Sequence, residues 1–232
     1  MFQPTQMAIS ADRRRMALRV AGYYFLQTAT LVTRAIDEDL LTALVFLGVS
    51  RANVRPLKED PAQDAAFAGA GDVPPDEMRR PVSVYAVAKD LRLPYETVRR
   101  HVVKLREAGM VEAGPGGVWV PNRVHLSPGL LSGMAENWEV ARRFLRDAIT
   151  VGAIPGKASA PAGPDVSRRT VRLSIDYFLD SLTEMAGTVG LDALSLLVGM
   201  AVARGNMQHF AQDRETAETY ARKLKQVSDE IA

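Results

Sequence analysis

The residues best suited to chemistry lie in the stretch from Pro94 to Gly109, where basic and polar side chains recur at helical spacing. Val98, Val102 and Leu105 fall on one side of such a helix, and we expect this side to face a core. The other side carries the candidate binding residues Tyr95, Glu96, Thr97, Arg99, Arg100 and Lys104. Arginine and lysine contact phosphate oxygens, and arginine also pairs with base edges. The spacing therefore predicts a helix that binds double-stranded DNA.

A shorter helix must precede and position this one. Apolar residues recur at helical spacing from Val84 to Leu91, and Ser83 can cap the helix that they predict. The turn 92–94 leads into the second helix, where Pro94 suits the first position because no N–H is needed there. We also count Ser83 among the DNA-binding residues.

A β-hairpin is predicted directly after the second helix. Residues 110–113 and 118–120 are β-prone runs, and Gly114-Pro115-Gly116-Gly117 joins them. Such a glycine-rich connection is typical of a hairpin. We expect Gly116 and Gly117 at its tip to touch the DNA backbone or the minor groove.

These parts, in this order, resemble the winged helix-turn-helix transcription regulators, most closely the GntR-like ones, over residues 81–121. The matching positions are Thr97-Val98-Arg99-Arg100, Leu105, Gly109 and Gly116-Gly117-Val118. The resemblance implies a winged helix-turn-helix with a small β-hairpin wing. Pro94 and Tyr95 depart from the family pattern, so the resemblance implies no base preference.

The flanking sequence is expected to be helical. Residues 12–55 form a predicted helical hairpin whose second helix also serves as the first helix of the winged domain 81–123, with 56–80 as a surface insertion. After the wing, the sequence predicts a helix over 127–150, a linker over 151–166, a second hairpin over 168–210 and a C-terminal helix over 213–232. The fold class is therefore mainly α.

The two hairpins are copies of one unit. At an offset of 153 residues, 15–54 aligns without a gap with 168–207, and thirteen of forty positions are identical. We predict that Asp39 and Asp192 cap the second helix of each copy. Because an apolar helix pair cannot bury itself alone, the copies should share a core within the chain or across a dimer. The residues expected to be buried are Leu41, Leu44, Val45, Leu194, Leu197 and Val198.

Composition narrows the function. The 232 residues include no cysteine and carry a net charge of +2, but residues 79–107 hold eight lysines or arginines against three acids. No apolar run reaches the ~18 residues of a membrane span, so we expect a cytoplasmic protein. The acids 37–39 could form an acid/base pair, but they are better explained as a helix cap. No catalytic signature, metal-ligand spacing or cofactor motif is present, so we expect no enzyme, metal or cofactor.

The sequence therefore predicts a sequence-specific, double-stranded-DNA-binding transcription regulator that acts as a homodimer and could respond to a small-molecule effector. Two alternatives remain open. A winged helix can serve as a protein-interaction or assembly module without binding DNA. The helical body could also make the chain a ligand-binding regulator. Basic residues on the exposed side of the second helix favour nucleic acid, whereas exposed apolar groups there would favour a protein partner.

Overall fold

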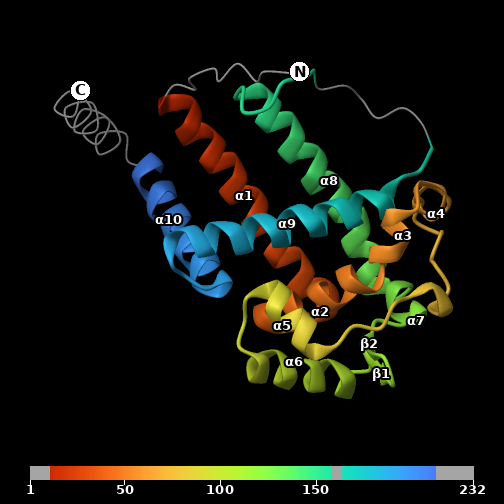
Figure 1. Ribbon diagram of the computed structural model, residues 1–232. Coiled ribbons are helices and arrows are strands. Elements are labelled where there is room, and N and C mark those ends of the chain that lie inside the picture. The colour runs from red at the N-terminus through yellow and green to blue at the C-terminus, as the bar shows by residue number, and fades with distance from the viewer. Residues whose placement is uncertain (1–10, 158–163, 213–232) are drawn as a thin grey trace, which may run out of the picture.

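The structure is a computed structural model that describes residues 11–157 and 164–212. It is mainly helical, with a small two-stranded antiparallel sheet (Figure 1). The C-terminal helix expected over 213–232 lies outside the described residues. In chain order the elements are α1 (Ala11–Ile36), α2 (Leu40–Asn53), α3 (Arg55–Glu59), α4 (Pro61–Ala66), the 3-10 helix η1 (Asp76–Met78), α5 (Val84–Leu91), α6 (Tyr95–Glu107), β1 (Glu112–Gly114), β2 (Gly117–Trp119), α7 (Asn122–His125), α8 (Pro128–Thr150), α9 (Ser167–Val189) and α10 (Ala193–Gln212).

Helix α2 lies at the centre of the fold. Its sequence is apolar on all sides, and every residue from Thr42 to Ser50 is buried. Helices α1, α5, α6 and α9 and strand β2 all pack against it. At Gly48 a Cβ atom would lie only 3.1 Å from the Leu91 side chain, so glycine lets α5 approach closely. A helix that is apolar all round must be covered all round, and the neighbours of α2 meet this requirement.

Helices α5 and α6 follow the sequence closely. Ser83 caps α5 by accepting the N–H of Ala86 at 3.1 Å. Helix α5 ends at Arg92, whose left-handed backbone (φ 52°) begins the turn into α6. Gly109 (φ 70°) follows the end of α6 and turns the chain toward β1. Glycine adopts this conformation without the steric cost that other residues meet.

A third segment pairs with the small sheet. Strands β1 and β2 pair from Glu112–Trp119 to Gly114–Gly117, and Val82 bridges Val118 on the other side of β2. Gly117 has φ 124°, and a Cβ atom there would lie 2.3 Å from the Val82 carbonyl oxygen. Only glycine allows this close approach of the two backbones.

The segment 56–80 contains more structure than the sequence suggested. It forms α3, α4 and η1 instead of an irregular surface insertion. Pro56 lies in the first turn of α3, where its missing N–H costs little. Asp60 caps α4 through two backbone N–H groups. Leu57 and Arg79 are buried, so this segment covers part of the core.

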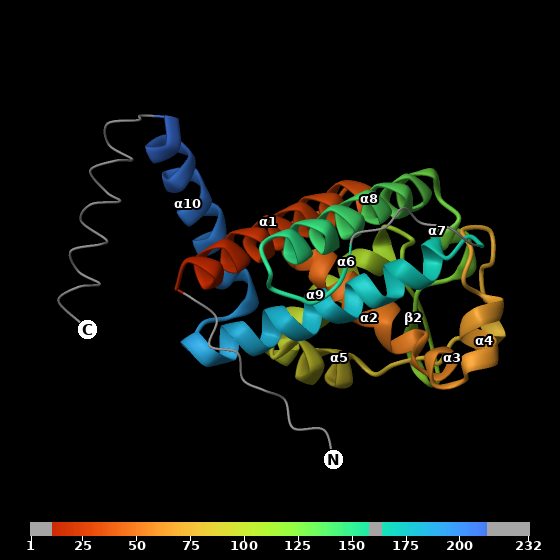
Figure 2. The same cartoon turned by 90° about the horizontal axis from the view of Figure 1, so that it is seen from above.

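Helices α1 and α8 lie side by side and run antiparallel (Figure 2). Gly133 allows their close contact, because a Cβ atom there would lie 2.9 Å from the Cβ atom of Ala35. Arg143, further along α8, stacks on Tyr23 of α1 at 4.8 Å from the ring centre. None of the described helices is long and apolar enough to cross a membrane alone. Helices α9 and α10 pass the same test only as a pair, and they are bent by 87° at their junction.

The predicted repeat corresponds to the helix pairs α1–α2 and α9–α10. At the offset of 153 residues, the last residues of α1 and α9 coincide, and so do the first residues of α2 and α10. The predicted caps are confirmed: Asp39 Oδ1 accepts the N–H of Thr42 at 2.9 Å, and Asp192 Oδ1 accepts that of Ser195 at the same distance. The side-chain hydroxyl of Thr42 also donates to Asp39 Oδ2, and that of Ser195 donates to Asp192 Oδ2.

The two copies share one core, and equivalent aromatic residues meet within it. The ring centres of Tyr24 and Tyr177 are 5.6 Å apart, and those of Phe25 and Phe178 are 5.5 Å apart. Helix α1 packs on α10, and α9 packs on α2. Reciprocal contacts of this kind are those of two units related by an approximate two-fold axis.

The burial predicted for the second copy is only partly correct. Leu197 is 2% exposed, as expected, whereas Leu194 is half-buried and Val198 is 54% exposed. In the first copy, Leu44 and Val45 are buried and Leu41 is half-buried. The difference arises because α5 and α6 cover α2, and no described element covers the matching side of α10.

Candidate nucleic-acid interface

Helix α6 presents one side to the core and the other to solvent. Val98, Val102 and Leu105 are buried, as the spacing predicts. On the solvent side, Tyr95 is 48% exposed and Arg100 is exposed. The exposed residues Glu96, Arg99 and Lys104 also lie on α6, and Thr97 is half-buried. All six candidate residues therefore lie on α6, but their side chains differ in exposure and in direction.

Arg99 and Glu96 form an exposed ion pair one turn apart. The Arg99 Nη2 atom lies 2.6 Å from Glu96 Oε1, and Nε donates to both carboxylate oxygens. The hydrogen bond from Arg99 lowers the pKa of Glu96, so the acid stays charged near neutral pH. An exposed pair of this kind contributes little stability. The Arg99 guanidinium is thus free to exchange Glu96 for another anion at small cost.

Arg100 has a different environment. It makes no ion pair with any residue in the two described ranges. It lies next to the Glu96–Arg99 pair on the exposed side of the helix. Its charge is therefore available to an external partner without breaking an internal contact.

Lys104 is directed toward the start of α2. Its Nζ atom lies 2.6 Å from Glu38 Oε2 and 2.7 Å from Asp39 Oδ2. Partial burial raises the pKa of Asp39, but hydrogen bonds from Lys104 and Thr42 outweigh this and hold it well below its usual range. The same contacts raise the pKa of Lys104. Lys104 therefore joins α6 to α2, and its charge is already neutralised within the chain.

His101 completes this connection between the two helices. Its Nδ1 atom lies 2.8 Å from Thr42 Oγ1, and that hydroxyl donates its proton to Asp39 Oδ2. A hydroxyl has one proton, so Nδ1–H must donate to Thr42. The sequence did not reveal this contact, because its members come from helices 59 positions apart.

The remaining candidates lie at the hairpin. Gly116 is exposed, and a Cβ atom there would lie 3.3 Å from Pro81. Gly117 is half-buried against Val82, and the exposed Ser83 follows in the chain. The oxygen of Ser83 already serves as the cap of α5. The hairpin follows the C-terminal end of α6 (Figure 1).

The hairpin is fixed to α2 by one buried residue, Asn53. Its Nδ2 group donates to the carbonyls of Arg80 (2.9 Å) and Val118 (3.1 Å), and its Oδ1 atom accepts the N–H of Val120 at 2.9 Å. These three bonds hold β2, the residue that follows it, and the segment that leads to the bridging Val82. In the sequence, Asn53 is notable only because the two copies of the repeat share it, as Asn53 and Asn206.

The basic surface is smaller than the charge count of the sequence implied. Arg79 is buried, and Arg92 donates to the carbonyl of Thr183 on α9. Lys104 is neutralised by acids of the chain. The exposed cations with no ion pair to a described residue include Lys89, Arg100 and Arg106.

In the part of the chain that the structure describes, no group of three or more histidine, cysteine or acidic residues could hold a metal ion. The acids 37–39 are engaged in capping and in contacts to Lys104. No protein-family model, curated protein or solved structure matches the chain.

Proposed function

We propose that the protein is a transcription regulator that binds double-stranded DNA through a winged helix-turn-helix. In this assignment α2, α5 and α6 are the three helices, β1 and β2 form the wing, and Val82 adds the short third strand. The order of these elements, the three-residue turn before α6 and the position of the hairpin support the assignment. It also agrees with the resemblance to GntR-like regulators over residues 81–121.

The observation that carries the proposal is the exposed side of α6. Arg100 has no ion-pair partner among the described residues, Arg99 is held only by an exposed pair, and Tyr95 lies a turn before them. Arginine side chains on a recognition helix can pair with guanine or hold phosphates. Lys104, in contrast, acts in positioning α6 against α2.

DNA binding is tested by selecting sequences from a random duplex pool and measuring affinity for them against salt. Log K should fall with log salt at about −0.9 per phosphate neutralised. Arg100→Ala should weaken binding by about tenfold or more. Arg146→Ala removes the same charge from an exposed residue in the C-terminal part of α8 and should have no effect, because the C-terminal end of α8 lies far from α6 (Figure 1). Equal affinities of the two variants at every salt concentration would refute the proposed role of α6.

A second candidate function, a protein-interaction module, has its own support. Tyr85 on α5 is 66% exposed, and Val103 on α6 is exposed beside Glu96 and Glu107. Exposed apolar and acidic groups disfavour contact with DNA phosphates and suit a protein partner. A selection that recovers no DNA, together with a partner whose binding depends on Tyr85 and not on Arg100, would favour this alternative.

We further propose that the regulator is a homodimer that uses the exposed side of α10. Val45 and Val49 of α2 are fully buried, whereas the matching Val198 and Val202 of α10 are 54% and 57% exposed. The two copies thus carry the same residues at these positions, but no described element covers the two valines of α10. A second copy would cover α10 and place two α6 helices on one duplex, as palindromic sites require.

Light scattering tests the dimer. The protein should have twice the chain mass at micromolar concentration, and Val198→Asp should convert it to a folded monomer. Val189→Asp, at another exposed apolar residue, the last one of α9, is the matched control. A wild-type monomer, with and without DNA, would contradict the dimer. A Val198→Asp variant that unfolds instead would mean that this side is covered within one chain.

A further inference from the structure

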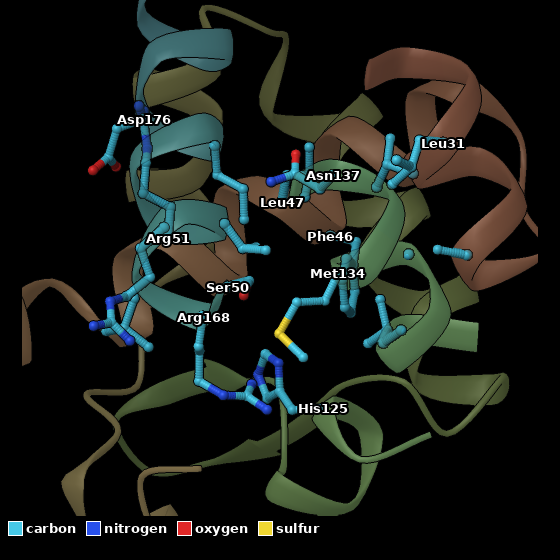
Figure 3. A pocket seen from close by; sticks show the side chains of 18 of the residues that line it. Leu31, Phe46, Leu47, Ser50, Arg51, His125, Met134, Asn137, Arg168 and Asp176 are labelled. Carbon is cyan, nitrogen blue, oxygen red and sulfur yellow. The ribbon is translucent and has the colours of Figure 1, made fainter. Parts of the chain in front are cut away.

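A cavity of about 120 Å³ lies between α1, α2, α8 and α9, away from α6 (Figure 3). One part of its wall is apolar and includes Phe46, Leu47, Met134 and Ile175. The rest is polar, with contributions from α3, α7 and the loop before α5. The cavity is thus lined by both halves of the repeat and by the segment that leads into the DNA-binding elements.

The polar wall is rich in cations, and most of them are paired with acids. Lys58 binds Asp176, with Nζ 2.5 Å from Oδ2. Arg51 binds the acids of α5 and α9. Arg172 lies 2.6 Å from Asp64 and also donates to backbone carbonyls. These side chains have their charge compensated by the chain itself.

Arg168 is the exception among the described cations that line the cavity. It is 9% exposed, and no described carboxylate lies within ion-pair distance of it. Its one described acceptor is the carbonyl oxygen of Ala70, 2.6 Å from Nη2, and its buried Nε atom has no hydrogen-bond partner. A guanidinium has five N–H donors, and Asp72 and Asp165 act on Arg168 only from beyond ion-pair distance. Burying a guanidinium without a paired anion is costly.

Two other donors lie at the same end of the cavity. Arg79 Nη1 lies 3.1 Å from His125 Nε2, and since arginine can only donate, Nε2 must accept. His125 is therefore neutral and carries its proton on Nδ1. Figure 3 shows Arg168 ending beside His125, with Met134 next to them. Arg79 is already paired with Asp76 at 3.2 Å, so Arg168 is the guanidinium at this end without an ion pair to a described carboxylate.

We propose that this cavity binds a small organic monocarboxylate with a compact apolar body, such as an aromatic acid. The carboxylate pairs with Arg168, and the apolar body lies against Phe46, Leu47 and Met134. A planar carboxylate fits a guanidinium through two parallel hydrogen bonds, and the buried setting strengthens them. An inorganic anion would leave the apolar wall without a partner, so an organic acid fits better.

The volume limits the size of the acid. An apolar cavity of about 150 Å³ admits benzene, so about 120 Å³ suits one ring or a short branched chain. Long-chain acids and nucleotides are too large. Benzoate is therefore the appropriate probe, with benzyl alcohol and benzylamine as neutral and cationic molecules of nearly the same shape.

The test is calorimetric titration of the full-length protein without DNA, so that its outcome does not depend on the proposed DNA binding. Benzoate should bind with one molecule per chain, at least tenfold more tightly than benzyl alcohol, and benzylamine should not bind. Arg168→Met should weaken benzoate by about 30-fold or more. Arg169→Met is the matched control, because the adjacent Arg169 is exposed and already paired with Asp64 at 2.7 Å; it should change affinity by less than about threefold.

Loss of binding in Arg168→Met is meaningful if the variant folds, and removal of an unpaired buried charge should not lower its unfolding midpoint. If it fails to fold, Val171→Phe provides the second test, because it fills the cavity and leaves Arg168 in place. Benzoate binding to Val171→Phe as tight as to the wild type would overturn the proposal. So would equal affinities for benzoate and benzyl alcohol, or no heat with either.

Discussion

Replacing Asn53 with alanine should loosen the hairpin from α2. The Asn53 side chain is fully buried and makes three hydrogen bonds to backbone groups, at Arg80, at Val118 of β2 and at Val120. No other residue type presents two donors and an acceptor in this arrangement, apart from the longer glutamine. Alanine removes all three bonds and leaves the backbone groups to find other partners.

The cost can be worked out bond by bond. The Val118 carbonyl keeps a partner, because it also accepts the N–H of Val82 at 3.0 Å, so this loss costs about 1 kcal/mol. The carbonyl of the exposed Arg80 can bind water and loses about as much. Val120 is fully buried, and its unpaired N–H costs about 1–3 kcal/mol. The total is about 3–5 kcal/mol, a large part of the stability of an ordinary domain.

Urea unfolding measures this difference, and Trp119 on β2 provides a fluorescence signal at the sheet itself. With a slope of about 3 kcal/mol per molar, the midpoint of Asn53→Ala should fall by about 1–1.7 M. Asn206 is the matched control: it occupies the equivalent position of α10 but is exposed. Asn206→Ala should change stability by less than about 0.5 kcal/mol. Equal midpoints for the two variants would refute the role assigned to Asn53.

Two further predictions concern the equivalent helix caps Asp39 and Asp192 and the buried His125. Asp192→Ala should lower the free energy of unfolding in urea by about 1 kcal/mol, because a helix cap is lost. Asp39→Ala should lower it by more, because Asp39 also binds Lys104. A smaller loss of stability for Asp39→Ala than for Asp192→Ala would contradict this. Burial, with Arg79 and Arg168 nearby, lowers the pKa of His125 to about 3, so the folded protein keeps it neutral where the unfolded chain protonates it. Stability should therefore fall by about 1.4 kcal/mol for each pH unit below 6.5. His125→Gln should remove this slope between pH 7 and 5.5, and an unchanged slope would point to another group.

Local sequence signals predicted several helix boundaries. Ser83, Asp39 and Asp192 cap helices as expected, and Gly109 terminates α6. These signals act over three or four residues, so the sequence displays them directly. The same holds for α2, whose continuous apolar run required cover on every side. The segment 56–80 was underestimated because its proline and alanine content obscured the cap at Asp60.

Contacts between distant segments could not be predicted in the same way. The sequence placed Lys104 among the candidate DNA contacts, but in the fold it binds Glu38 and Asp39. Arg79 was counted as surface charge, yet the fold buries it beside His125. Arg79 also pairs locally with Asp76, but His125, like the acids that bind Lys104, lies more than 40 positions away, and no periodicity records such a pairing. The cavity at Arg168 arises in the same way, from four helices meeting in space.

The two copies of the repeat share residues that are buried in the first copy and exposed in the second. In the first copy, the residues after α2 supply a sheet and two helices, so Asn53 and Val45 find buried partners. In the second copy, the same residue types recur on α10 as Asn206 and Val198, and both are exposed. Retaining an apolar residue on an exposed helix costs solubility unless something covers it. The side of α10 that matches the covered side of α2 is therefore the observation on which the proposed homodimer rests. In that proposal, the same apolar side of α10 in a second copy of the chain covers it.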